Sequence, residues 1–193
     1  MSTHDNHKIE PWIVEQTEEI KDCRIFTLNR EIVRSPATGK RGEFFILDSP
    51  DWVNVIPVTS DGQIVFVAQY RLGSRQVSLE TPAGLINPGE AVEAAAAREL
   101  REETGYTARS WKVLGHTYAN PAFMTNHFTA VVAEGVTLTD PTAWDEHEEL
   151  EMRLIPADQV GDLIATGAVD NSFSVLALSW YLLYKQGVLQ PRG

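Results

Sequence analysis

Residues 84–106 read GLINPGEAVEAAAARELREETGY, and this stretch constrains the fold of the chain more than any other. Pro88-Gly89 is a turn signal, and residues 91–104 are an Ala-rich run of strong helix formers. Gly105 stands where helices commonly end in a left-handed conformation. The stretch therefore predicts a turn, a helix of about four turns and a glycine cap.

Three glutamates share one face of this predicted helix. Glu99, Glu102 and Glu103 are spaced i, i+3 and i+4, so their carboxylates lie side by side and repel one another. A hard divalent cation such as Mg²⁺ or Mn²⁺ neutralises such a set through oxygen ligands and favours substrates that bring phosphates. Arg98 is able to pair with Glu90 or Glu102 and hold a carboxylate in place. The alternative is a solvated acidic face, the usual meaning of a charge run.

The stretch resembles the Nudix box, Gly-x5-Glu-x7-Arg-Glu-U-x-Glu-Glu-x-Gly-U, where U is apolar. Every defined position is filled in this sequence. Seven of these positions are single residue types, and such a match arises by chance in a chain this long roughly once in a million. The resemblance implies a Mg²⁺-dependent pyrophosphohydrolase, with Mn²⁺ as a possible substitute. It implies that Glu99 and Glu103 bind metal and that Glu102 and Arg98 act in catalysis.

The similarity extends to segments around the box. Residues 65–71 (VFVAQYR) and 80–84 (ETPAG) are similar to the corresponding segments of the ADP-ribose pyrophosphatase branch of the Nudix family. This implies that Arg71 contacts the diphosphate and that the carbonyl of Ala83 is a metal ligand. A planar guanidinium fork suits a diphosphate on physical grounds as well.

Four further residues are candidates for contacting the substrate. Arg75 is a second phosphate-binding candidate or a surface arginine. Glu80 either joins the metal or phosphate shell or pairs with an arginine. Trp52 is able to stack on a base, or to pack in the core or in a dimer interface. Pro121 lies where a proline marks the substrate loop in this branch, but Asn-Pro-Ala replaces the usual Ser-Pro-Gly, so the sugar stays open.

Residues 144–151, WDEHEELE, form a dense acidic stretch ahead of a strand-like segment. A solvated loop is the usual interpretation of such a stretch. The resemblance implies instead a mobile acidic loop that supplies a glutamate over the substrate. We expect Glu146 to act as the general base and Glu148 to bind metal, because Glu148 lies nearer the following strand.

The function that follows is cleavage of the diphosphate of a nucleoside diphosphate sugar, such as ADP-ribose or GDP-mannose. Water activated by metal ions and a loop carboxylate would attack one phosphorus in line, giving a nucleoside monophosphate and a sugar phosphate. Three alternatives remain. The first is hydrolysis of nucleoside triphosphates or capped RNA ends, and the second is a non-catalytic Nudix ligand sensor. The third is a protein that mainly mediates assembly and has weak catalysis.

The remaining sequence predicts an α+β protein, a Nudix-fold α/β/α sandwich with a mixed sheet and an N-terminal antiparallel β extension. Residues 1–48 are expected to form a tail and this extension, and residues 49–193 the hydrolase domain. In resembling enzymes such strands join two subunits, so we expect a homodimer. The predicted strands are 12–20, 23–33, 43–47, 52–59, 63–70, 77–80, 111–118, 127–136 and 150–154, and the later helices are 156–166 and 171–186.

Charge and composition limit the classes of partner that we expect for this chain. A net charge of −11 argues against binding to nucleic acid, but it permits a small anionic nucleotide sugar held through metal ions. The single cysteine excludes an intrachain disulfide. No apolar run approaches a membrane span and the polar N-terminus shows no signal peptide, so we expect no membrane partner and a cytoplasmic location.

Overall fold

The structure, a computed structural model, describes residues 9–144 and 149–192 of the chain. These residues form two compact units. The first comprises the chain up to Pro50 together with Tyr118–Asn126, and the second comprises Asp51–Thr117 and the chain from His127 onward. Within the described residues, no helix is long and apolar enough to cross a membrane.

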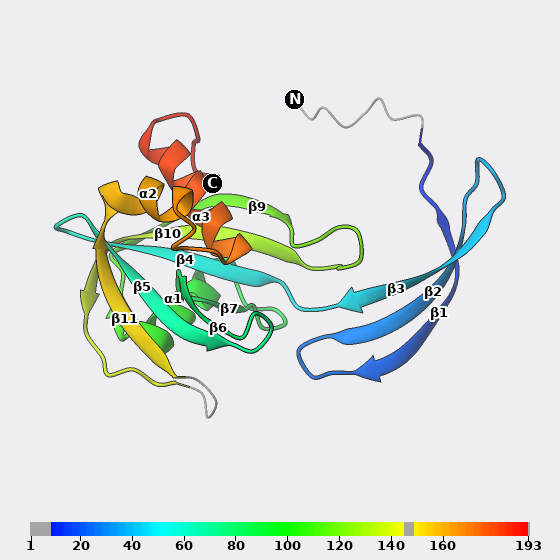
Figure 1. Cartoon of the computed structure of the whole chain (residues 1–193), viewed down its shortest axis with the longest axis horizontal. Helices are drawn as coiled ribbons and strands as arrows, with labels where there is room; N and C mark the ends of the chain where they lie inside the picture. The colour runs from blue at the N-terminus through cyan, green and yellow to red at the C-terminus, as the bar shows by residue number, and fades with distance from the viewer. Residues whose placement is uncertain (1–8, 145–148, 193) are drawn as a thin grey trace. The chain divides into compact units, whose positions relative to one another are not determined.

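The first unit is built on a three-stranded antiparallel sheet, in the order β1 (Ile13–Asp22), β2 (Thr27–Arg34) and β3 (Arg41–Asp48). These strands run from blue to cyan in Figure 1. All ten residues of β1 are exposed. Glu15 of this strand accepts hydrogen bonds from Arg34 and Arg41, both at 2.7 Å, so side-chain ion pairs cross the sheet. The predicted antiparallel extension is confirmed.

Residues 118–126 join the first unit through the end of β3. The Leu47 N–H donates to the Phe123 carbonyl at 2.8 Å, and the Thr125 N–H donates to the Leu47 carbonyl at 3.1 Å. The Thr125 hydroxyl also donates to Asp48 at 2.6 Å. Pro121 therefore belongs to the same unit as the N-terminal strands, a grouping that a boundary at residue 48 does not include.

The second unit contains an eight-stranded mixed sheet whose central path is β11-β5-β4-β10-β8. β4 runs parallel to β10 from the pair Trp52 and Phe128 onward, whereas β5 is antiparallel to both β4 and β11. β6 pairs with β5, β7 with β4 and β9 with β10. The strands are β4 (Trp52–Thr59), β5 (Gln63–Arg71), β6 (Gln76–Glu80), β7 (Ala83–Leu85), β8 (Tyr106–Thr107), β9 (Ser110–Tyr118), β10 (His127–Leu138) and β11 (Leu150–Pro156).

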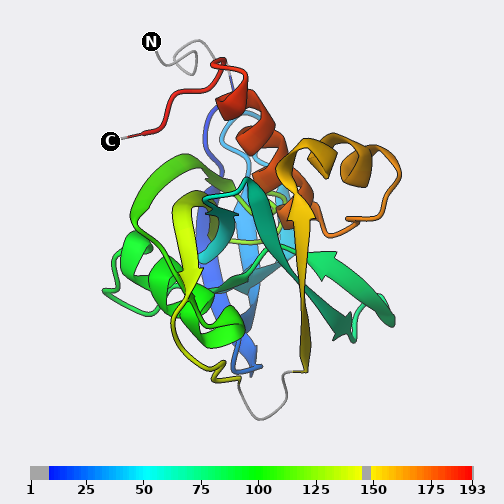
Figure 2. The same ribbon diagram turned by 90° about the vertical axis from the view of Figure 1, so that its left-hand side faces the viewer.

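Helices cover both faces of this sheet, which gives the predicted α/β/α arrangement (Figures 1 and 2). Alternate residues of a strand face opposite sides. Val53, Val55 and Val65 pack against α1 (Val92–Thr104) in one core. Their neighbours Ile56 and Ile64 belong to the second core, with α2 (Val160–Ala165) and α3 (Ser172–Lys185). Helix α1 thus lies on one face of the sheet, and α2 and α3 lie on the other.

The ends of the helices follow from local sequence. Helix α1 ends at Gly105, whose φ is 73° and whose N–H donates to the carbonyl of Arg101, as the sequence predicts. Helix α3 begins after Asn171, whose side chain accepts the N–H groups of Phe173 and Ser174. Two predictions need correction. No strand was predicted at residues 83–85, but β7 starts at residue 83 and pairs with β4; and the helix expected at 156–166 opens with a 3₁₀ turn, η1 (Ala157–Gln159).

Gly115 of β9 marks a place where helix and sheet pack too closely for a side chain. A Cβ at this position would lie 2.4 Å from the Trp180 ring of α3. We expect Gly115→Ala to lower the free energy of unfolding by about 1–3 kcal/mol, because the core has to shift to admit the methyl group. Gly161→Ala is the control: nothing lies within 4 Å of a Cβ there, and alanine in helix α2 should add about 0.5–1 kcal/mol. Urea unfolding measures the stability of both variants. An unchanged stability of Gly115→Ala would contradict the close packing of Gly115 against Trp180.

Candidate active site

Helix α1 presents the predicted acidic residues against strand β7. The side chains of Glu99 and Glu102 are 14% and 39% exposed, and Glu103 is almost fully buried. Glu103 Oε2 accepts the N–H of Ala83 at 3.2 Å. The structure therefore brings together three of the predicted metal ligands, Glu99, Glu103 and the backbone of Ala83.

Gly84 explains how the helix approaches the strand so closely. A Cβ at this position would lie 2.0 Å from Glu99 Oε1, so only glycine leaves room for the carboxylate where it stands. The sequence singled out Gly84 as part of the box. It did not show that the Glu99 carboxylate occupies the space where a side chain at position 84 would lie. A backbone segment flanked by two carboxylates offers the hard oxygen donors that divalent cations bind.

Arg98 stands among these acids as the central cation. Its guanidinium donates to Glu90 Oε1 at 3.0 Å and to Glu99 Oε1 at 2.6 Å, and it lies 3.4 Å from Glu102 Oε2. It also donates to the Leu85 carbonyl at 2.9 Å, a contact that no sequence pattern indicated. Both predicted pairs of Arg98 are thus formed, and the arginine orients the acidic face. Within residues 9–144 and 149–192, no three acidic, histidine or cysteine side chains are already gathered as a metal-ligand set.

Glu90 carries the clearest electrostatic consequence of this arrangement. Hydrogen bonds from Arg98, and then from the Asn87 N–H, lower the pKa of Glu90 from 4.5 to about 2. The same carboxylate raises the pKa of Arg98 above its ordinary value. The charged form of Glu90 is therefore the form that the folded state favours.

This shift predicts a pH dependence with a definite sign. Because the pKa of Glu90 is lower in the folded state, its contribution to stability is present above about pH 4.5 and is lost as the pH falls toward 2. We expect the stability difference between the wild type and Glu90→Gln to be largest at neutral pH and to shrink through that window. Urea unfolding at a series of pH values measures the difference. A difference that stays constant down to pH 2 would contradict the assigned pairing.

Arg71 and Glu80 form a second ion pair, between neighbouring strands β5 and β6. Arg71 Nε and Nη2 donate to the two carboxylate oxygens of Glu80, at 2.8 and 2.6 Å. Glu80 is only 1% exposed, whereas the side chain of Arg71 is 43% exposed. Of the two interpretations of Glu80, pairing with an arginine is therefore the one observed. The buried carboxylate fixes the plane of an arginine that remains partly open to solvent.

The other substrate candidates are placed differently. Arg75 is exposed in the turn after β5, with a φ of 58° and its N–H bonded to the Arg71 carbonyl. Trp52 is half-buried and packs edge-on against Phe173 at 4.9 Å, which agrees with the packing alternative for this residue. Pro121 belongs to the first unit. The roles of these residues as substrate contacts stay predictions.

The acidic stretch is described only at its edges. Glu146 and Glu148 lie outside the described residues. Before them, the Trp144 indole donates to the Glu103 carbonyl at 2.9 Å, and the Ala143 N–H donates to the Glu102 carbonyl at 2.8 Å. The chain that enters the acidic stretch is therefore bonded to the last turn of the helix that carries the box glutamates.

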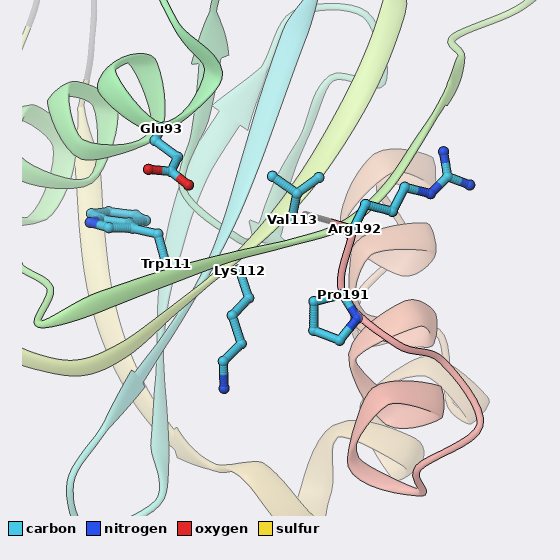
Figure 3. Close-up of a pocket in the computed structure, with 6 residues that line it drawn as sticks. All are labelled: Glu93, Trp111, Lys112, Val113, Pro191 and Arg192. Carbon is cyan, nitrogen blue, oxygen red and sulfur yellow. The ribbon is translucent and has the colours of Figure 1, made fainter.

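A separate pocket of about 370 Å³ contains none of these candidates. It is lined by Glu93, Trp111, Lys112, Val113, Pro191 and Arg192. Figure 3 shows the side chains of Lys112 and Arg192 extending away from Glu93 and Trp111. Lys112 Nζ is engaged with Glu134 and the Tyr184 hydroxyl, at 2.9 and 2.7 Å. The lining groups do not converge on a common point, so we assign this pocket no part in the chemistry.

The arrangement of the second unit, with an acidic helix packed against a mixed sheet, is that of Nudix hydrolases. A solved structure described as an ADP compounds hydrolase superimposes with a TM-score of 0.82 at 25% sequence identity, covering 95% of this chain and all of the other. The NUDIX domain family model matches residues 49–176. The chain therefore belongs to the Nudix family.

Similar curated proteins indicate the branch of the family to which the chain belongs. The ADP-ribose pyrophosphatase of Bacillus subtilis is 31% identical over 172 residues, which are 89% of this chain and 92% of the relative. The methanol dehydrogenase activator of Bacillus methanolicus is 30% identical over 169 residues, 87% of this chain and 91% of the relative. The chain is thus a Nudix hydrolase of the ADP-ribose pyrophosphatase branch, as its box and neighbouring segments predict.

Proposed function

We propose that this protein hydrolyses the diphosphate bond of nucleoside diphosphate sugars, of which ADP-ribose is the leading substrate and GDP-mannose a second. The products are a nucleoside monophosphate and a sugar phosphate. The observation that carries the proposal is the packing of Glu99 and Glu103 against the backbone of Ala83 and Gly84. The similarity to an ADP-ribose pyrophosphatase supports the substrate class.

Members of the Nudix family generally use divalent metal ions, and the residues present fit such an ion. Glu99, Glu103 and Ala83 would hold Mg²⁺, or Mn²⁺ in its place, with Glu148 as a further ligand. The bound ion supplies charge neutralisation on the diphosphate and makes a bound water acidic. The direct pairing of Arg98 with Glu99 at 2.6 Å helps to orient this carboxylate beside the strand.

The protein's own groups then divide the remaining work. Arg71, oriented by Glu80, donates to the phosphate oxygens of the substrate. Arg98 and Glu102 fix the acidic face of the helix. Glu146 takes the proton of the attacking water, since the box carboxylates are engaged as ligands and are poorly placed to accept it.

A substrate panel tests the function. The protein with Mg²⁺ is incubated with nucleoside diphosphate sugars, dinucleotides, nucleoside triphosphates and capped RNA, and products are resolved by chromatography. We expect the diphosphate sugars to be cleaved fastest. A strong preference for triphosphates would refute the substrate class, and tight binding of one compound without cleavage of any would support a ligand sensor instead.

We also propose that the protein is a homodimer, on the basis of the first unit. Its sheet exposes several large apolar side chains, including Ile13, Val14, Phe44 and Phe45, which is a liability for strands that stay uncovered. Light scattering at micromolar concentration should give twice the mass of the chain. Phe45→Glu should shift the mass toward the monomer, whereas Leu72→Ser, which alters an exposed residue of the second unit, should not. A monomeric wild type would refute the proposal.

A further inference from the structure

A short corner between β6 and β7 connects the Arg71–Glu80 ion pair with the contact between Ala83 and Glu103. Glu80 ends β6 and pairs with Arg71, and Ala83 begins β7 and contacts Glu103. Only Thr81 and Pro82 separate them. Thr81 is completely buried, so the path of the backbone into Ala83 depends on the groups that surround this threonine.

The first turn of α3 supplies one of these groups. Asn171 caps the helix by accepting the N–H groups of Phe173 and Ser174, at 3.0 and 3.1 Å, which fixes the first turn. Ser174 is completely buried and its hydroxyl oxygen accepts the Thr81 N–H at 3.1 Å. A second bond joins adjacent parts of the chain, from the Ser78 hydroxyl of β6 to Asp170, which precedes α3, at 3.1 Å.

Strand β4 supplies the other group. The side-chain amide of Asn54, which is 2% exposed, donates to the Thr81 hydroxyl at 3.0 Å. The next residue of the strand, Val55, donates its N–H to the Pro82 carbonyl at 2.8 Å. Hydrogen bonds from two different elements therefore fix the Thr81 N–H and the Pro82 carbonyl, on the two sides of the Thr81–Pro82 peptide bond that precedes Ala83.

Simple core packing does not explain these residues. An apolar side chain at position 54 or 174 would fill similar space without the cost of burying a polar group. Each polar group here is instead matched to a partner on the same corner. Such a network specifies one backbone path rather than adding apolar contacts.

We propose that Ser174, Thr81 and Asn54 are positioning residues that hold the Ala83 backbone at the distance from Glu103 that metal binding requires. This inference rests on the proposed function, because it takes Ala83 and Glu103 as metal ligands. The residues touch neither substrate nor metal, and they act through the backbone. Groups that orient ligands in this way typically change metal affinity 10- to 100-fold when they are removed.

Direct Mn²⁺ binding tests the inference without a turnover assay. The dissociation constant of Mn²⁺ is measured by electron paramagnetic resonance for the wild type, Ser174→Ala, Thr81→Val and Thr81→Ser. We expect Ser174→Ala and Thr81→Val to raise the constant about tenfold, and Thr81→Ser to restore the wild-type value because it keeps the hydroxyl. Thr81→Val keeps the shape of the side chain and the N–H bond to Ser174, so it carries the test if Ser174→Ala does not fold.

The matched control is Ser179→Ala, on the same helix. The Ser179 hydroxyl donates to the Val175 carbonyl within α3 at 2.7 Å, so its loss should leave the Mn²⁺ constant unchanged. Glu103→Gln should weaken Mn²⁺ binding and thereby show that the measured ion occupies this site. Wild-type Mn²⁺ affinity in folded Ser174→Ala and Thr81→Val would overturn the inference. A wild type that binds Mn²⁺ but cleaves no compound would refute the proposed function alone, and the variant constants would still decide this inference.

Discussion

Glu103→Gln is expected to lower turnover by about 10²-fold or more while the protein stays folded, and Glu99→Gln is expected to do the same. Each change keeps the size of the side chain and removes one charged ligand, so a major electrostatic contribution to the transition state is lost. In Glu103→Gln the amide oxygen is still able to accept the Ala83 N–H, which now lies 3.2 Å from the carboxylate. The loss should therefore appear in kcat and in metal affinity and not in the unfolding curve.

Glu93→Gln is the matched control, because Glu93 is an exposed residue in the first turn of the same helix. Its turnover should equal that of the wild type. Chelation should abolish the activity of the wild type, and Mg²⁺ or Mn²⁺ should restore it. Near-wild-type turnover in Glu103→Gln would remove the metal-site assignment.

Gly84→Ala should produce a loss of similar size through geometry alone. The new methyl group would coincide with the Glu99 carboxylate, 2.0 Å away. Because the carboxylate is the end of a flexible side chain, we expect it to swing away while the strand and the helix remain in place. Turnover should then fall by about 10²-fold, as for the loss of the ligand itself.

Gly73→Ala is the control for this variant, since nothing lies within 4 Å of a Cβ at that position. Unfolding curves should show little change for either variant, and kcat with Mg²⁺ should separate them. Combining Gly84→Ala with Glu99→Gln should add little further loss, because both act on one side chain. Fully additive losses would show that the methyl group acts somewhere else.

Local chemistry explains why most of the fold was predictable. The Ala-rich run and Gly105 fix the end of α1, and β-branched runs mark β4 and β5. Strand β7 was missed because it exists through pairing with β4 and its three residues have no strand pattern of their own. The membership of residues 118–126 in the first unit was also missed, because it depends on backbone hydrogen bonds to Leu47, which the side-chain sequence does not encode.

The candidate site, like the fold, was predictable from the sequence only in part. The pair of Arg98 with Glu102 follows from helical spacing, and pairing with an arginine was one of two alternatives for Glu80, which makes a bidentate contact with Arg71. The link between Thr81 and Ser174 joins residues 93 positions apart, and each of them looks in the sequence like an ordinary polar residue. Only the packing of α3 on the sheet brings them together.

The parallel pairing of β4 with β10 also limits when parts of the second unit are able to fold during synthesis on the ribosome. Helix α1 is synthesised between these strands, yet the core that covers it needs Val131, Ala133 and Val136 of β10 as well as residues of β4. Contacts between distant segments form slowly, and apolar surfaces that wait for them are exposed to aggregation. A nascent chain that has not yet reached Val136 therefore cannot complete the core that covers α1, and we expect this interval of synthesis to depend most on chaperones.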